Sequence, residues 1–166
     1  MVKVIQNQQT EYISFTDLFR KYSQDLYRYS LSILKDEDDA KDAVQEAFIR
    51  YIEKEKSFRG ECSQKSWLLI IARNYCYSKL KRADQSNEII NDETFNECYE
   101  LHIEEEITLN EALKSLNPLQ NEVLFLKEYG GYSYNEIAEI TNLTLENVKT
   151  ILFRARQKLK KILKGY

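Results

Sequence analysis

Two helical segments close to the C-terminus, within residues 132–161, constrain the fold more than any other feature of the sequence. Ser133 and Glu136 form an S-x-x-E pattern, in which the hydroxyl accepts from the third helical amide and the carboxylate accepts from the cap amide. Apolar residues follow at helical spacing as far as Ile140. The pattern predicts a short helix that begins at Ser133.

A second, longer helix is predicted after the short turn Thr141-Asn142-Leu143. The turn requires a left-handed backbone at Asn142, which Asn tolerates better than most residues other than Gly. Thr144 is the predicted cap of the second helix. The predicted buried face of this helix follows steps of three and four residues, and consists of Leu145, Val148, Leu152, Ala155 and Leu159. Together the two segments predict a helix-turn-helix unit.

The second helix of such a unit enters the DNA major groove through residues near its N-terminus. From Lys149 to Lys164 there are seven Lys or Arg and no Asp or Glu, which suits contacts with DNA phosphates. A solvated basic face on an ordinary bundle helix would explain these charges by themselves. The capping box, the turn and the basic helix together favour DNA binding.

Helical signals dominate the rest of the chain as well. One Pro and four Gly in 166 residues favour an all-α protein. Three helices are predicted before the acidic segment described below and four after it. They are expected to begin near residues 14, 36, 63, 107, 117, 133 and 144, and Asn117 with Pro118 is the clearest of the other start signals.

Charge divides the chain into three segments. Residues 1–82 carry 15 basic and 12 acidic side chains, and residues 107–166 carry 9 and 6, so each block has a net charge of +3. Residues 83–106 carry nine acidic side chains and no basic one, a net charge of −9. We therefore predict two small helical domains, residues 10–82 and 107–166, joined by a flexible acidic linker, residues 83–106.

Several function classes are not expected. The chain has no apolar run of the roughly 18–20 residues that a membrane span needs and no signal-peptide core at its start, so we expect a cytoplasmic protein without direct membrane insertion. Cys62, Cys76, Cys98 and His102 do not have zinc-ligand spacing. No phosphate loop and no nucleophile–base arrangement is present, so we expect no enzyme, catalytic residue, metal, cofactor or small-molecule substrate.

Three motifs together resemble the extracytoplasmic-function (ECF) sigma factors, the small two-domain branch of the bacterial sigma-70 family. Residues 39–48, D-A-x-D-x-V-Q-E-x-F, are similar to that family's polymerase-binding helix. Residues 67–74, W-L-x-x-I-A-R-N, are similar to its −10 element helix, and residues 116–156 to its −35-binding domain. Asn147 and Ile151 depart from a common Thr and Arg of the recognition helix, which puts the promoter sequence in doubt but not the activity.

The resemblance implies a sigma factor that binds core RNA polymerase and directs initiation by recognising −35 and −10 promoter elements and opening the −10 region. It also implies an anti-sigma factor, linked to the membrane, that holds the protein inactive. The expected polymerase-binding residues are polar and lie off the apolar stripe of the second helix. They are Asp39, Asp42, Gln45, Glu46 and Arg50.

The same resemblance implies two sets of DNA-binding residues. A loop before the third helix is expected to hold a base flipped from the −10 stack, and basic residues of that helix are expected to hold the backbone. The −10 candidates are Phe58, Arg59, Glu61, Ser63, Lys65, Arg73, Asn74, Lys79 and Arg82. The −35 candidates are Thr144, Glu146, Asn147, Lys149 and Thr150 near base edges, and Arg154, Arg156 and Lys158 on phosphates.

Other interpretations stay open on the sequence alone. A stand-alone helix-turn-helix regulator that binds an operator is the main alternative, although such proteins usually dimerise and no dimerisation helix is evident. Trp67 is predicted to be a core residue, and Phe153 to pack in the core or at the groove edge. By analogy the acidic linker is expected to thread the RNA channel of the polymerase, with a solubilising tether as the alternative.

Overall fold

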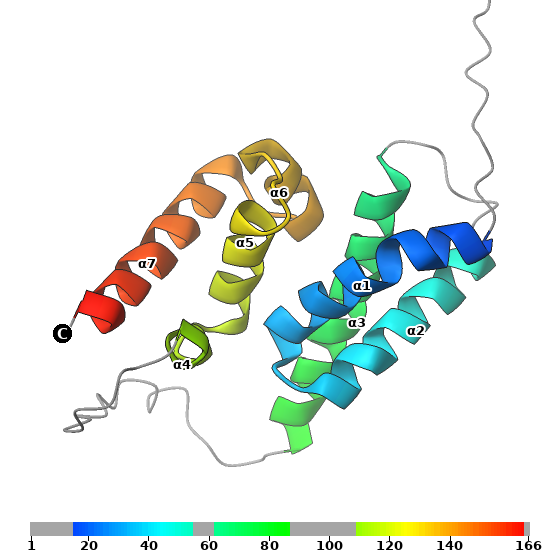
Figure 1. Cartoon of the computed structure of the whole chain (residues 1–166), viewed down its shortest axis with the longest axis horizontal. Coiled ribbons are helices and arrows are strands. Elements are labelled where there is room, and N and C mark those ends of the chain that lie inside the picture. The colour runs from blue at the N-terminus through cyan, green and yellow to red at the C-terminus, as the bar shows by residue number, and fades with distance from the viewer. Residues whose placement is uncertain (1–14, 55–61, 87–108, 165–166) are drawn as a thin grey trace, which may run out of the picture.

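The structure, a computed structural model, describes residues 15–54, 62–86 and 109–164 (Figure 1). These residues form seven α-helices and no strand, so the all-α prediction is confirmed for this part of the chain. Ser14, the 55–61 loop and residues 87–106 of the acidic linker lie outside the described residues, whereas residues 83–86, predicted to begin the linker, form the last turn of α3. The helices are α1 (Phe15–Leu34), α2 (Glu37–Lys54), α3 (Gln64–Ser86), α4 (Leu109–Lys114), α5 (Pro118–Glu128), α6 (Tyr134–Thr141) and α7 (Leu145–Lys164).

Helices α1, α2 and α3 pack against one another as the N-terminal bundle. Asp36 begins α2 as predicted, because its side chain accepts from the Asp39 amide at 2.9 Å. The helical stripes meet in a core that excludes water. Its fully buried side chains include Leu18, Leu26, Tyr29, Ile33, Ala43, Ala47, Leu68, Ala72 and Cys76.

Apolar residues at helical spacing form a stripe on α1 and another on α2, and both stripes extend further than the core does. Phe15 and Phe19 on α1 are 46% and 42% exposed, and Ile52 on α2 is 52% exposed. These residues lie near the start of α1 and the end of α2, which meet at Phe48. A residue near a helix end has fewer neighbouring side chains. The helical spacing of apolar residues therefore identifies the inward face of a helix, but not how far along the helix that face is buried. The helical spacing of these three residues in the sequence predicts that they are buried, and that prediction is wrong.

Helices α4 to α7 form the C-terminal group, in which α7 packs on α4, α5 and α6. The predicted caps are confirmed. Asn117 and Ser133 each form a complete capping box, and Thr144 accepts from the Asn147 amide at 3.3 Å. Asn142 has the predicted left-handed backbone, with φ 55° and ψ 40°. The helix-turn-helix unit therefore forms as the sequence indicates.

The two groups of helices contact each other directly. Helix α5 packs against α1, and α6 lies against α3 (Figure 1). The C-terminal core consists of Leu116, Val123, Leu126, Ile137, Ile140, Val148, Leu152 and Ala155. None of the described helices is long and apolar enough to cross a membrane.

Candidate nucleic-acid and protein interfaces

The predicted reading residues of the helix-turn-helix lie on the open face of α7. Glu146, Asn147, Lys149 and Thr150 are all exposed, and Lys149 is 3.9 Å from the Glu146 carboxylate. Val148, on the opposite face, is fully buried and fixes the rotation of the helix. The first two turns of α7 therefore present polar side chains to solvent, as a recognition helix requires.

The three predicted phosphate-binding residues of α7 have different surroundings. Arg154 is exposed. Arg156 pairs with Glu128 at the end of α5, and the hydrogen bond to that carboxylate raises the pKa of Arg156. Lys158 donates to the Ser115 carbonyl at 2.6 Å, at the end of α4. Arg156 and Lys158 thus also hold α7 onto its own domain.

Phe153 lies on the surface of α7, where its side chain is 62% exposed. It follows Thr150 by three residues and Lys149 by four, so it shares the face of the reading residues. Core packing of Phe153 is therefore wrong, and packing at the edge of a DNA groove remains a prediction.

The predicted polymerase-binding residues lie along α2. Asp42 and Gln45 are exposed, whereas Asp39, Glu46 and Arg50 are half-buried. Arg50 donates to Glu46 at 2.6 Å one turn earlier, which fixes both side chains on the same face. Helix α2 packs on α1 and α3.

Lys79 connects this set with the predicted −10 residues. Its ammonium group pairs with Asp39 and lies 3.9 Å from the Asp42 carboxylate, so α3 is tied to α2. A groove of about 600 Å³ runs beside this contact, and its lining includes Arg50 and Arg82. The structure therefore brings members of the two predicted sets together on one surface.

The other described −10 candidates lie on α3 away from this groove. Ser63 caps α3, because its hydroxyl accepts from the Ser66 amide at 3.0 Å. Lys65 pairs with Asp25 of α1 at 2.7 Å, and Asn74 is exposed. Phe58, Arg59 and Glu61 lie outside the described residues. Trp67, predicted to be core, is partly buried and packs on Tyr51 with 5.0 Å between ring centroids.

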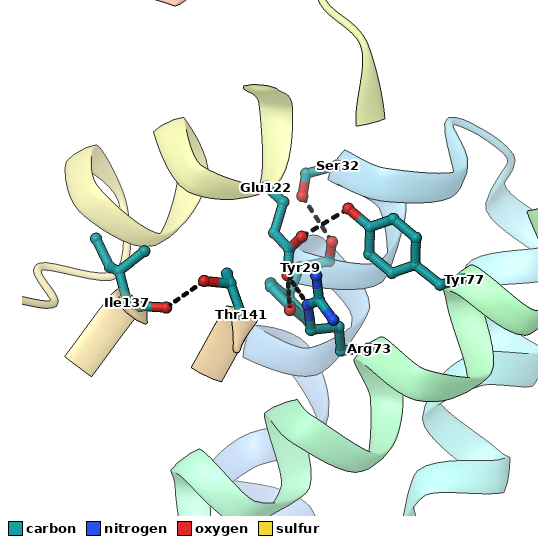
Figure 2. Close-up of polar contacts among 7 residues, drawn as sticks. All are labelled: Tyr29, Ser32, Arg73, Tyr77, Glu122, Ile137 and Thr141. Atoms are coloured by element: carbon teal, nitrogen blue, oxygen red, sulfur yellow. Dashed lines mark hydrogen bonds and ion pairs between the residues drawn. The ribbon is translucent and has the colours of Figure 1, made fainter. Parts of the chain in front are cut away.

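Arg73 meets a buried carboxylate that the sequence did not indicate (Figure 2). Glu122 on α5 is fully buried and accepts three hydrogen bonds from the N-terminal bundle. Its Oε1 accepts from Tyr29 Oη at 2.6 Å and from Arg73 Nε at 2.7 Å, and its Oε2 accepts from Tyr77 Oη at 2.7 Å.

The electrostatics of this cluster keep every donor protonated. Burial and the charge of Glu122 raise the pKa of both Tyr29 and Tyr77. Burial by itself would lower the pKa of Arg73, but the charge of Glu122 and its hydrogen bond outweigh that effect and raise it. One cation and two hydroxyls therefore surround one carboxylate, which satisfies a charge that would be costly to bury alone.

The comparisons with known proteins assign the two groups of helices to two regions of one protein family. Residues 18–86 match the family model described as sigma-70 region 2, and residues 107–159 match sigma-70, region 4. The chain is 33% identical over 157 residues to RNA polymerase sigma factor YlaC of Bacillus subtilis, which covers 89% of this chain and 91% of that protein. This chain belongs to the sigma-70 family of RNA polymerase sigma factors.

Further relatives are consistent with that family. The ECF RNA polymerase sigma-E factor of Escherichia coli is 32% identical to this sigma factor over 135 residues, 72% of this chain and 71% of that protein. The sigma factor RpoE of Bartonella quintana, solved with the anti-sigma factor NepR, superposes with a TM-score of 0.72 at 26% identity and covers 90% of this chain and 96% of RpoE. The sequence prediction of an ECF sigma factor is confirmed, and the operator-binding regulator is not favoured.

Sequence reasoning missed three residues of this sigma factor that the geometry singles out. Glu122 lies three residues after Leu119 and four before Leu126, on the apolar stripe of α5, and an acid at such a position was the available signal. Tyr29 lies on the apolar stripe of α1, so its spacing indicates a core residue and not a hydrogen-bond donor to another domain. Lys35 has a left-handed backbone, φ 58°, and its side chain reaches the end of α4, which no local pattern indicated.

Proposed function

We propose that this sigma factor reads −35 promoter DNA with the exposed N-terminal turns of α7. The observation that supports this is the outward position of Asn147, Lys149 and Thr150 on a helix whose other face is buried in the C-terminal domain. Their polar groups are free to approach base edges in a major groove. Arg154 would contribute a phosphate contact beside them.

The N-terminal bundle is proposed to bind core RNA polymerase through α2. Asp42 and Gln45 are exposed there, and the Glu46–Arg50 pair extends the same polar face. Helix α3 would hold the −10 element, with Asn74 and Arg82 on its open surface. Capture of a flipped −10 base by the loop of Phe58 remains a proposal that rests on the family resemblance.

Regulation by an anti-sigma factor is part of the proposal. The Bartonella quintana relative RpoE was solved with its anti-sigma factor NepR. By analogy this sigma factor would be held inactive in the cytoplasm by an anti-sigma factor linked to the membrane. It would act without catalysis of its own, because the polymerase carries out RNA synthesis.

Run-off transcription tests the main proposal. Core bacterial RNA polymerase is incubated with a pool of promoter fragments, with and without this protein. Discrete start sites that appear only with the protein are expected, and their upstream sequences would define its −35 and −10 elements. The absence of new start sites, together with binding to some of the fragments, would instead support an operator-binding regulator.

Two variants locate the reading surface. Lys149→Ala is expected to reduce initiation from the newly found promoters by about 5–150-fold, since one base-edge contact contributes about 1–3 kcal/mol. Lys160→Ala is the matched control, because Lys160 is also an exposed lysine of α7 but lies more than two turns further along the helix. Equal activity of the two variants would contradict reading by the first turns of α7.

A further inference from the structure

Three donors of the N-terminal bundle converge on one anion. Arg73 and Tyr77 are four residues apart on α3 and therefore share one face, and Tyr29 approaches from α1 (Figure 2). The Arg73 guanidinium lies 4.5 Å from the centroid of the Tyr77 ring, which holds it in place. In this structure the anion is the carboxylate of Glu122, supplied by α5.

A DNA phosphate is the natural alternative occupant of such a site. Phosphate oxygens accept hydrogen bonds from Arg and Tyr, which are frequent backbone contacts in protein–DNA complexes. Arg73 is also one of the residues that the sequence analysis assigns to −10 DNA. The carboxylate of Glu122 therefore uses three donors that are equally suited to a nucleic-acid phosphate.

We propose that Tyr29, Arg73 and Tyr77 form a binding site for a phosphate of promoter DNA, and that Glu122 occupies this site in the free sigma factor. Packing of α5 on α1 and binding of DNA at this face of α3 then exclude each other. The choice of DNA as the ligand rests on the proposed function. The packing of the C-terminal domain on the N-terminal bundle through Glu122, which we call closure, does not rest on it.

Other contacts across the same boundary support closure. Lys35 of α1 donates to the carbonyls of Lys114 and Leu116 at 2.8 Å and 2.7 Å, and so caps the end of α4 from the other domain. The ammonium group of Lys65, another −10 candidate, lies 5.8 Å from the centroid of the Tyr132 ring. Closure thus engages two predicted −10 residues, Arg73 and Lys65, with the C-terminal domain.

Closure leaves the −35 surface accessible. The reading residues Asn147, Lys149 and Thr150 are exposed in the same structure in which Arg73 is held by Glu122. The free protein is therefore expected to meet duplex DNA through α7 before the site on α3 opens.

The test compares Glu122→Lys with Glu139→Lys in the full chain, without polymerase. Glu139 is exposed on α6, so its substitution changes the net charge equally without touching the cluster. Small-angle X-ray scattering reports closure, and fluorescence anisotropy of a fluorescein-labelled, mixed-sequence single-stranded DNA reports binding. Circular dichroism checks that each variant is folded, and if Glu122→Lys is not, Glu122→Gln is compared with Glu139→Gln instead.

We expect Glu122→Lys to have a larger radius of gyration than the wild type. We also expect it to bind the single-stranded probe about tenfold more tightly than Glu139→Lys does. This factor follows if about one molecule in ten of the wild type is open, because only open molecules bind the probe. A radius equal to that of the wild type would overturn closure by Glu122. An increased radius with the affinity of Glu139→Lys would overturn competition with DNA.

The phosphate site itself is tested in the open background. Tyr77→Phe removes one donor, so Glu122→Lys/Tyr77→Phe should bind the probe about threefold or more weakly than Glu122→Lys; equal affinities would overturn the site. These measurements use only the free protein and DNA. A failure of run-off transcription would contradict the sigma-factor proposal and leave their outcome unaffected.

Discussion

The turn of the helix-turn-helix offers a quantitative test of how the sequence fixes the DNA-binding unit. Asn142 has φ 55° and ψ 40°, and its amide donates to the carbonyls of Ala138 and Glu139. Its side chain is exposed, so substitutions there change backbone preference without changing core packing. A left-handed backbone costs about 1–2 kcal/mol for a residue with a Cβ, least for Asn, and Gly avoids this cost.

We therefore expect Asn142→Val to lower the free energy of unfolding by about 1–2 kcal/mol, because Val is branched at Cβ and strained in this region. For a chain of this size each kcal/mol shifts the melting temperature by about 2–4 °C. The Val variant should melt about 2–8 °C below the wild type. Asn142→Gly should remain within about 2 °C of it, because Gly accepts the same backbone conformation.

Thermal unfolding followed by far-ultraviolet circular dichroism measures these shifts. Asn135→Val is the matched control, since Asn135 is exposed on α6 in a right-handed helix and Asn and Val have similar helix propensities. The reasoning fails if Asn142→Val melts at the temperature of that control. It also fails if Asn142→Gly loses as much stability as Asn142→Val, because the loss would then come from the Asn side chain.

Three further predictions concern single residues. Ser133→Ala should cost about 1 kcal/mol in urea unfolding, because the hydroxyl accepts from the Glu136 amide. The backbone amide and the hydroxyl of Ser133 both lower the pKa of Glu136. The part of the cost that comes from the hydroxyl's hydrogen bond to this carboxylate is therefore present above the unfolded pKa of 4.5 and is lost as pH falls through the folded pKa, and a cost that does not decrease at acidic pH would contradict this. Arg154→Ala should weaken duplex binding at every sequence and reduce the salt slope by about one in anisotropy titrations, whereas a sequence-dependent loss would indicate base reading. Burial raises the pKa of Cys76 to about 11, so iodoacetamide followed by mass spectrometry should modify half-buried Cys62 first, and equal rates would refute the difference.

Local signals allowed the sequence to predict most of the fold. The capping boxes of Asn117 and Ser133 and the cap of Thr144 join residues only three positions apart, so they are visible without the tertiary structure. The left-handed turn at Asn142 depends on that residue's own backbone preference. Helix starts near these residues were therefore predicted correctly.

Side-chain partners far apart in the sequence could not be predicted in this way. Lys79 and Arg156 were assigned to DNA because they are basic and lie on the predicted DNA-binding helices. In the structure Lys79 also pairs with Asp39, forty positions away, and Arg156 with Glu128, twenty-eight away. A charge pattern shows that a cation is available, but only the packing of the helices shows which anion it meets.

The sequence contains only a weak signal of the contact between the two domains, and that signal is Glu122. A carboxylate on an apolar stripe must find donors or remain solvated, because an unpaired buried charge is costly. Tyr29 is a polar residue on the stripe of α1, and Arg73 lies within the mostly apolar first half of α3. Among the described contacts, neither Tyr29 nor Arg73 pairs with a carboxylate of its own domain. Glu122 of the other domain supplies the carboxylate that accepts from both side chains. Polar residues at buried helical positions therefore indicate that another surface completes them, although the sequence alone does not identify that surface.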